Sequence, residues 1–414
     1  MPYSDSGLKP CNNVALCKRG LPLVELIAIC IFCIFYIDFE IQGKYQIISP
    51  FIALIYLGYC YFKEPSMSRI IVHFVLACII VALLYQLMTI PVTISSDSNI
   101  GVKYFYSNFS QYIIAFFPLA ILYRTIKYAT QKQIVIIISV TLLTAILLVR
   151  AALKIAEINP DILHSMNQTA LEEAGVTLQG FNFVYAFTFL IITCFIFIKK
   201  RSRPAIKYIS IGCLIYFIYF LLKAQFALAF VTTFISCIYL YYITAKRLDN
   251  KIITIIGLCV VAYLLPYFLE WLIDITKDSQ VLNIRLKEIY NSLTGNHSED
   301  SDMQSRFDLY WKCILAFIDS PILGNRYLPF NGHSTFLLAF AYLGIFGGTF
   351  VCYIFYKASK FVKSVIGIQK YKYFKPLMCQ VILMGLTNPI LSVPSNFIML
   401  FFICPLLIRQ FVKE

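Results

Sequence analysis

The chain has 414 residues, of which 60% are hydrophobic and 14% are charged, and its formal net charge is +14. Soluble domains are about one quarter charged, so this composition excludes an ordinary soluble protein. Apolar runs of roughly 20 residues recur from end to end, and each is long enough to cross a bilayer as a helix. Because the runs do not alternate polar and apolar residues, they do not match the strands of a membrane β-barrel. The sequence therefore predicts an all-α, polytopic integral membrane protein.

In chain order, the apolar runs predict about twelve transmembrane helices. Nine fall within residues 1–273 and three within residues 333–414. The polar segment 274–332 between them predicts a large extracytoplasmic loop, with interfacial helices at residues 283–293 and 305–318. The runs begin near Leu21, Gln46, Ile70, Phe109, Ile134, Phe181, Tyr208, Ala224, Ile252, His333, Pro376 and Ser395.

The positive charges support this count. If the N-terminus lies in the cytoplasm and the runs alternate, 24 of the 35 Lys and Arg residues fall on the cytoplasmic side. On the same scheme, 16 of the 21 Asp and Glu residues fall outside. Cytoplasmic loops rich in Lys and Arg set the orientation of membrane proteins, so both termini are predicted in the cytoplasm. The same distribution argues against a nucleic-acid partner, because the positive charge is explained by the predicted cytoplasmic loops of a membrane protein.

The fourteen cysteines fall mostly inside apolar runs, where we interpret them as small packing residues. The predicted outer loop contains only Cys313, which excludes a disulfide within it. No further His, Cys or carboxylate stands at metal-ligand spacing around His333, so we expect no metal site.

Cations on the predicted outer side are candidates for binding an anion. Arg150 interrupts the apolar end of the fifth run, and Lys154 follows one helical turn later on the same face. A charge at that depth is costly unless it is paired or hydrated. Two interpretations stay open: the side chains snorkel to the interface, or they clamp an anionic head group, for which the arginine fork is suited. Lys223 lies in a tight hairpin between two runs. It is either an ordinary turn lysine or a further residue that binds the anionic head group.

The predicted helix at residues 305–318 carries Phe307, Trp311 and Ile314 on one face, which is typical of a helix lying in the membrane interface. Arg306 lies at its start, where the helix dipole disfavours a cation, so we expect a functional reason for it. His333 opens the tenth run. A lone histidine at a helix start more often serves as a polar cap, so by itself it indicates little.

Four short segments occur in a characteristic order: Ser-Arg-Phe-Asp-Leu-Tyr-Trp at 305–311, Asp-Ser-Pro-Ile-Leu-Gly at 319–324, Gly-His-Ser-Thr-Phe-Leu at 332–337 and Tyr-Leu-Gly-Ile-Phe-Gly at 342–347. This set resembles the O-antigen polymerase (Wzy-type) and O-antigen ligase superfamily of bacterial surface-polysaccharide enzymes. The resemblance covers about 45 residues, and the size, the span count and the position of the outer loop also fit.

The resemblance implies a metal-independent glycosyltransferase of GT-C-like fold in the bacterial inner membrane, without a cofactor. Such enzymes use undecaprenyl-diphosphate-linked glycans at the periplasmic face in lipopolysaccharide biosynthesis, and a chain-length regulator protein is a further partner. Arg306 and His333 would be the catalytic pair. The cations expected to bind the diphosphate are Arg150, Lys154, Lys223, Arg285 and Arg326, and the aromatic residues expected to bind the glycan are Tyr310, Trp311 and Tyr327.

One departure concerns the helix that follows the tight outer hairpin, where family members often carry an arginine. Here the hairpin reads Lys223-Ala224-Gln225, and lysine offers a point charge in place of a two-pronged fork. Polymerase is our first interpretation, because Gly-His-Ser is the more polymerase-like form, the outer loop is compact and no nucleotide-sugar site appears on the cytoplasmic side. Ligase is the close alternative. A lipid-linked oligosaccharide flippase is the alternative of another class, although internal repeats and mid-membrane charges typical of transporters are absent.

Overall fold

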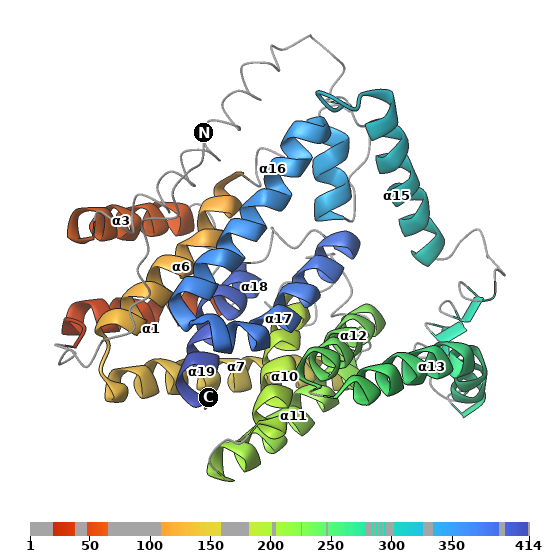
Figure 1. The fold of residues 1–414 in the computed structure, drawn as a ribbon, viewed down its shortest axis with the longest axis horizontal. Helices are drawn as coiled ribbons and strands as arrows, with labels where there is room; N and C mark the ends of the chain where they lie inside the picture. Colours follow the sequence, from red (N-terminus) through yellow and green to blue (C-terminus); the bar gives the residue numbers. More distant parts are fainter. Residues whose placement is uncertain are drawn as a thin grey trace.

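The computed structural model describes residues 20–37, 48–64, 109–158, 182–200, 204–224, 226–245, 247–275, 302–325, 334–388 and 394–412, with a few positions between 277 and 294. Every regular element in these residues is helical, which confirms the all-α prediction. The helices are α1 (Leu23–Ile37), α3 (Ile48–Lys63), α6 (Phe109–Tyr128), α7 (Gln131–Ile158), α10 (Asn182–Lys199), α11 (Pro204–Ala224), α12 (Ala227–Thr244), α13 (Leu248–Ile275), α15 (Asp302–Asp319), α16 (Thr335–Ile366), α17 (Ile368–Thr387), α18 (Pro394–Ile398), the π-helical turn η2 (Met399–Ile403) and α19 (Cys404–Phe411) (Figure 1).

The predicted runs fall on these helices, except for the run from Ile70, which lies outside the described residues. The predicted tight hairpin is present, since α11 ends at Ala224 and α12 begins at Ala227. The helix α17 begins at Ile368, before the predicted start of the apolar run near Pro376, because the lysine-rich segment before Pro376 is also helical. The interfacial helix predicted at 305–318 is α15, whereas most of the one predicted at 283–293 lies outside the described residues.

Three described helices are long and apolar enough to cross a membrane: Gln131–Glu157, Pro204–Ala224 and Thr335–Ile366. Shorter apolar helices accompany them at Leu23–Ile37, Phe51–Lys63, Val184–Lys199, Leu228–Thr244 and Ser395–Phe411. Large apolar side chains also cover the outside of the bundle. On α13, for example, Ile253 is 63% exposed and Tyr263 is 70% exposed. An apolar exterior of this extent suits contact with lipid.

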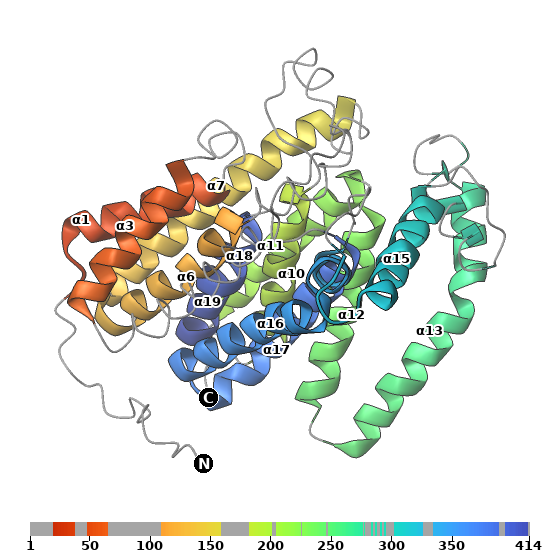
Figure 2. The ribbon, with the colours of Figure 1, turned by 90° about the horizontal axis from the view of Figure 1, so that it is seen from above.

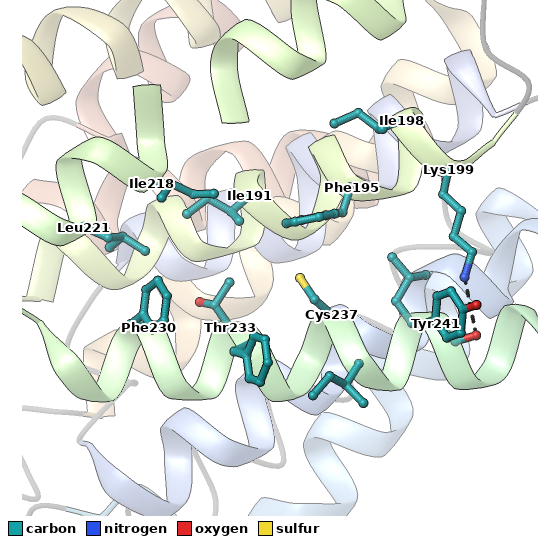
Figure 3. A pocket seen from close by; sticks show the side chains of 13 residues that line it. Ile191, Phe195, Ile198, Lys199, Ile218, Leu221, Phe230, Thr233, Cys237 and Tyr241 are labelled. Carbon is teal, nitrogen blue, oxygen red and sulfur yellow. Dashed lines mark hydrogen bonds between the residues drawn. The ribbon is translucent and has the colours of Figure 1, made fainter. Parts of the chain in front are cut away.

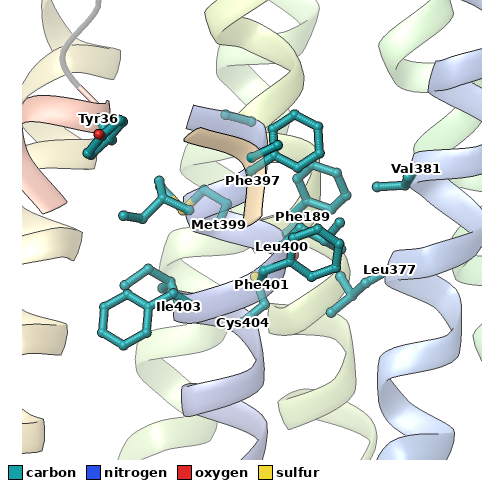
Figure 4. Close-up of a cluster of buried hydrophobic side chains, with 14 of the residues drawn as sticks. Tyr36, Phe189, Leu377, Val381, Phe397, Met399, Leu400, Phe401, Ile403 and Cys404 are labelled. Carbon is teal, nitrogen blue, oxygen red and sulfur yellow. The ribbon is translucent and has the colours of Figure 1, made fainter. Parts of the chain in front are cut away.

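The last helical segment forms the centre of the bundle. Residues 395–408 are all buried, and a helix that is apolar on every side belongs in a core. Phe397 and Phe401 stack with their ring centroids 6.0 Å apart, and Phe116 of α6 contacts both rings. Phe189 of α10 lies in the same cluster (Figure 4). This segment therefore holds the surrounding helices together.

A buried polar group links three of those helices. The Gln380 amide of α17 accepts a hydrogen bond from Ser236 of α12 at 2.9 Å and donates one to Thr188 of α10 at 3.0 Å. It also donates to Thr232 at 3.1 Å. Hydrogen bonds of this kind between apolar helices fix their register in the absence of a strong hydrophobic driving force.

Ion pairs join α1, α3 and α6 at one end of the bundle. The guanidinium of Arg124 forms a two-pronged contact with the Glu25 carboxylate, including a bond of 2.7 Å from its NH2 group, and both side chains are almost fully buried. Tyr56 donates a further hydrogen bond to Glu25 at 3.1 Å. Lys127 pairs with Glu64, just beyond the end of α3, at 2.7 Å. The end of α3 and the end of α6 therefore lie side by side.

The last turns of α16 and α19 and the first turn of α17, which carry lysine or arginine residues, also meet at this end. Lys370 of α17 donates to the carbonyl oxygen of Arg409 at 2.8 Å, and Arg409 donates to that of Ile366 at 3.0 Å. The rings of Tyr123 in α6 and Phe361 in α16 connect this group to the ion pairs, with centroids 6.3 Å apart. We call this the basic end of the bundle, and we call the other the opposite end.

Candidate functional site

The helix that follows His333 is broken at Gly344. The backbone there has φ 62° and ψ −165°, a conformation that favours glycine. The rings of Phe336 and Phe355 nonetheless lie 5.5 Å apart, although 19 residues of straight helix would separate them by about 28 Å. Phe340 likewise lies directly against Gly348. Residues 335–343 therefore fold back beside residues 345–366, so the single helix predicted from His333 is a pair of antiparallel limbs (Figure 1).

The turn after α15 fits into this break. The Asn325 N–H donates to the carbonyl oxygen of Ala341 at 2.7 Å, and the Ile345 N–H donates to that of Pro321 at 2.7 Å. A Cβ atom on Gly324 would lie 2.2 Å from the Tyr342 carbonyl oxygen, so only glycine permits this approach. The Pro-x-x-Gly and Gly-x-x-Gly segments are thus joined by a close contact between two backbones.

The start of α16 is bound to the end of α17. Ser334 accepts a hydrogen bond from the Leu337 N–H at 3.1 Å and donates to the Gly385 carbonyl oxygen at 3.0 Å. The Thr335 hydroxyl and N–H both donate to the Asn388 carbonyl oxygen, at 3.0 and 3.2 Å. Ser334 is thus the N-cap of α16. The capping role considered for His333 belongs to its neighbour, while His333 itself lies outside the described residues.

The helix α15 also contacts the end of α17. Tyr310 donates a hydrogen bond to the Thr387 carbonyl oxygen at 3.1 Å, at the end of α17. Arg306 lies one turn before Tyr310 on the same face and is partly buried. The helix that carries Arg306 and the start of α16 therefore converge on the last residues of α17. Figure 2 shows α15 beside α16 and α17 from above.

The two faces of α15 differ. Tyr310 and Cys313 face α16 and α17, whereas Phe307 is 51% exposed, Trp311 60% and Ile318 60%. The apolar face predicted for the membrane interface is thus an exposed stripe. Trp311 belongs to that stripe, whereas Tyr310 is half-buried beside Phe307, with their ring centroids 6.2 Å apart. Burial raises the pKa of the Cys313 thiol to about 11, so it is neutral and unsuited to act as a nucleophile.

Three of the other predicted cations, Arg150, Lys154 and Lys223, lie away from α15. Tyr216 of α11 donates to the Ile146 carbonyl oxygen of α7 at 3.3 Å, so the ends of these two helices are neighbours. Arg150 and Lys154 follow on α7 and Lys223 on α11, and all three are exposed. Both views place the end of α7 away from α15 (Figures 1 and 2). These three form a second group of cations at the opposite end, and Arg285, Arg326 and Tyr327 lie outside the described residues.

Sequence analysis missed Asn388, which the structure sets beside the start of α16. Its side chain is 2% exposed and its amide NH2 donates to the Thr387 hydroxyl at 3.2 Å, but its Oδ1 accepts no hydrogen bond from a described group. Buried polar atoms are normally satisfied, so this oxygen is an exception among the described residues. The dipeptide Asn388-Pro389 is a turn signal that sequence alone could have used to place this helix end.

Among the described residues, no group of three or more His, Cys, Asp or Glu side chains has the arrangement of a metal site. In comparisons with known proteins, no family model matches the chain and no curated protein matches it.

Proposed function

We propose that the chain is an O-antigen polymerase of the Wzy type, a glycosyltransferase that joins lipid-linked repeat units at the periplasmic face of the inner membrane. The observation that carries the proposal is the insertion of the turn at 320–324 into the break at Gly344. This contact unites the motifs of the resemblance and directs α15, with Arg306, toward the residues around the start of α16.

The proposed topology has about twelve spans, a GT-C-like arrangement and both termini in the cytoplasm. Its support is the meeting of helix ends at the basic end. Because α3 and α6 both finish there, they run in the same direction, as the alternating scheme requires. Arg409 of α19 and Lys370 of α17 also lie at this end, which we take as the cytoplasmic side.

In the proposed reaction, a hydroxyl group of the incoming repeat unit attacks the anomeric carbon of the growing chain. The bond from that carbon to the diphosphate oxygen breaks, and undecaprenyl diphosphate leaves with the bonding electrons. The guanidinium of Arg306 stabilises the charge that develops on the diphosphate, as a fixed two-pronged donor. His333 accepts the proton of the attacking hydroxyl, since a neutral imidazole has a suitable pKa. No metal or cofactor is required.

The geometry refines the expected roles of the other cations. Arg150, Lys154 and Lys223 stand at the ends of α7 and α11, so the proposal assigns the diphosphate first to Arg306. Asn388 joins the site as an acceptor for a glycan hydroxyl. Tyr310, bonded to Thr387, acts as a positioning residue for α15.

The test is a deletion strain complemented with single variants, with surface glycan length read on gels. We expect Arg306→Ala and His333→Ala to reduce long chains by about 100-fold or more, as loss of an electrostatic or acid–base group does. Arg306→Lys should also be impaired, because a point charge replaces the fork. Lys312→Ala, an exposed position on the same helix, is the matched control. EDTA should leave the purified enzyme active.

The deletion strain itself separates the alternatives. One-repeat glycan on lipid A-core indicates a polymerase. Long chains that remain on undecaprenyl diphosphate indicate a ligase, and lipid-linked repeats that remain in the inner leaflet indicate a flippase. Normal chain lengths from Arg306→Ala or His333→Ala would refute the site.

A further inference from the structure

A groove of about 420 Å³ lies between α10, α11 and α12 (Figure 3). Its walls are almost entirely apolar. Phe195, Phe230 and Phe234 are each more than one third exposed, so the groove opens on the surface of the bundle. The lining residues used below are Leu221, Phe230, Thr233, Cys237, Tyr241 and Lys199.

A single cation closes one end of the groove. The Lys199 ammonium donates to the Tyr241 carbonyl oxygen at 3.4 Å and lies 3.7 Å from the centroid of the Tyr241 ring. No carboxylate pairs with it among the described residues. Lys199 stands in the last turn of α10, at the basic end of the bundle. The groove is therefore an apolar slot with one positive charge at its mouth.

The length of the groove matches one leaflet of a bilayer. Along α12 its wall runs from Phe230 to Tyr241, which is about 16 Å of helix. The hydrocarbon core of a bilayer is about 30 Å thick, so one leaflet supplies about 15 Å. A chain that enters from the basic end would reach the middle of the membrane and stop near Leu221 and Phe230.

The charge around the mouth favours an anion. Lys200, Lys207, Arg247 and Lys251 end or begin the helices at this side, and Asp249 is the single carboxylate among described residues 199–207 and 241–251. Anionic lipids of the cytoplasmic leaflet are attracted to such clusters of Lys and Arg. A lysine that only snorkels keeps its charged group in water and needs no neighbouring groove. Lys199 instead lies at the mouth of a groove as deep as one leaflet.

We propose that this groove binds one acyl chain of an anionic phospholipid from the cytoplasmic leaflet, with Lys199 holding the phosphate. The inference rests on the proposed membrane orientation and is independent of the proposed glycosyl transfer. Thr233 and Cys237 line the middle of the slot, where the acyl chain would lie.

The experiment measures lipid retained by the purified full chain in neutral detergent, by native mass spectrometry. Phosphatidylglycerol, phosphatidylcholine and undecaprenyl phosphate are the probes. We expect phosphatidylglycerol to be preferred over phosphatidylcholine, with about tenfold weaker retention in Lys199→Ala and recovery in Lys199→Arg. The matched control is Lys357→Ala on α16, which removes an exposed lysine that also lies over a tyrosine ring, 5.1 Å from the centroid of Tyr353, but does not line the groove.

A second variant tests the slot itself. Cys237→Trp places an indole in the wall and should lower phosphatidylglycerol retention, while the melting temperature shows that the protein is folded. Equal retention by wild type and Lys199→Ala would overturn the proposal, as would equal binding of phosphatidylcholine or a preference for undecaprenyl phosphate. Glycan length in the complemented strain reports separately on the proposed catalytic function.

Discussion

At the basic end, Arg124 and Lys127 are neutralised by Glu25 and Glu64, whereas at the opposite end Arg150, Lys154 and Lys223 meet no carboxylate among the described residues. The basic end is thus held by side-chain charge pairs. Around α15, α16 and α17 the opposite end is held by backbone hydrogen bonds and by close contact of Gly324 with Gly344. The comparison teaches that the buried charge of Arg124 serves the fold through its partner, while exposed cations, such as Lys199 at the basic end and Arg150 at the opposite end, are available for a ligand.

This difference has a physical reason. A buried charge without a partner is costly, so Glu25 and Arg124 each depend on the other. Backbone contacts between glycines need no charge and hold two segments in a fixed relation. A site built on such contacts needs no charge pair to hold its segments together.

The largest effect is expected from Arg124→Leu, which leaves the Glu25 carboxylate buried and unpaired. Loss of one partner of a buried pair costs about 3–5 kcal/mol of unfolding free energy. Thermal unfolding in detergent measures it. The double variant Glu25→Leu with Arg124→Leu should regain much of the loss, because no charge then remains buried. A double variant as unstable as the single one would show that the pair does more than neutralise charge.

The Gly344→Ala substitution should have the next largest effect. The added Cβ would lie 2.3 Å from the Ile322 carbonyl oxygen, and this backbone conformation, which essentially only glycine adopts, costs about 1–3 kcal/mol in another residue. We expect the turn at 320–324 to detach, seen as faster proteolysis between α13 and α16 and shorter surface glycan. Gly212→Ala is the control, since nothing lies within 4 Å of its Cβ position. Equal protease resistance in both variants would contradict this role of the glycine contact.

The smallest effect is expected from Tyr310→Phe, which removes the hydrogen bond to the Thr387 carbonyl oxygen. A hydrogen bond of this kind contributes about 0.5–1.5 kcal/mol, so the melting temperature should fall slightly. If Tyr310 positions Arg306, the maximal rate should fall more than the substrate KM changes. Tyr263→Phe on the exposed face of α13 serves as control. An unchanged maximal rate would show that Tyr310 supports the fold alone.

Sequence analysis predicted most helices because apolar runs are local signals, and the runs predicted from Ile134 and Tyr208 fall within Gln131–Glu157 and Pro204–Ala224. It also located α15, since Phe307, Trp311 and Ile314 recur at the spacing of one helix face. It did not foresee the break at Gly344. The sequence Gly-x-x-Gly permits a break, but the contact with Gly324 that fixes it joins residues far apart along the chain.

The sequence by itself determined the all-α architecture, the apolar exterior and the ordered motifs around Arg306 and His333, because each of these is written in short stretches of residue type and spacing. Only the tertiary structure decided that Arg124 pairs with Glu25, that α16 folds back on itself, and that Arg150, Lys154 and Lys223 stand apart from α15. Those outcomes depend on which helices become neighbours, and that is set by packing across the whole bundle.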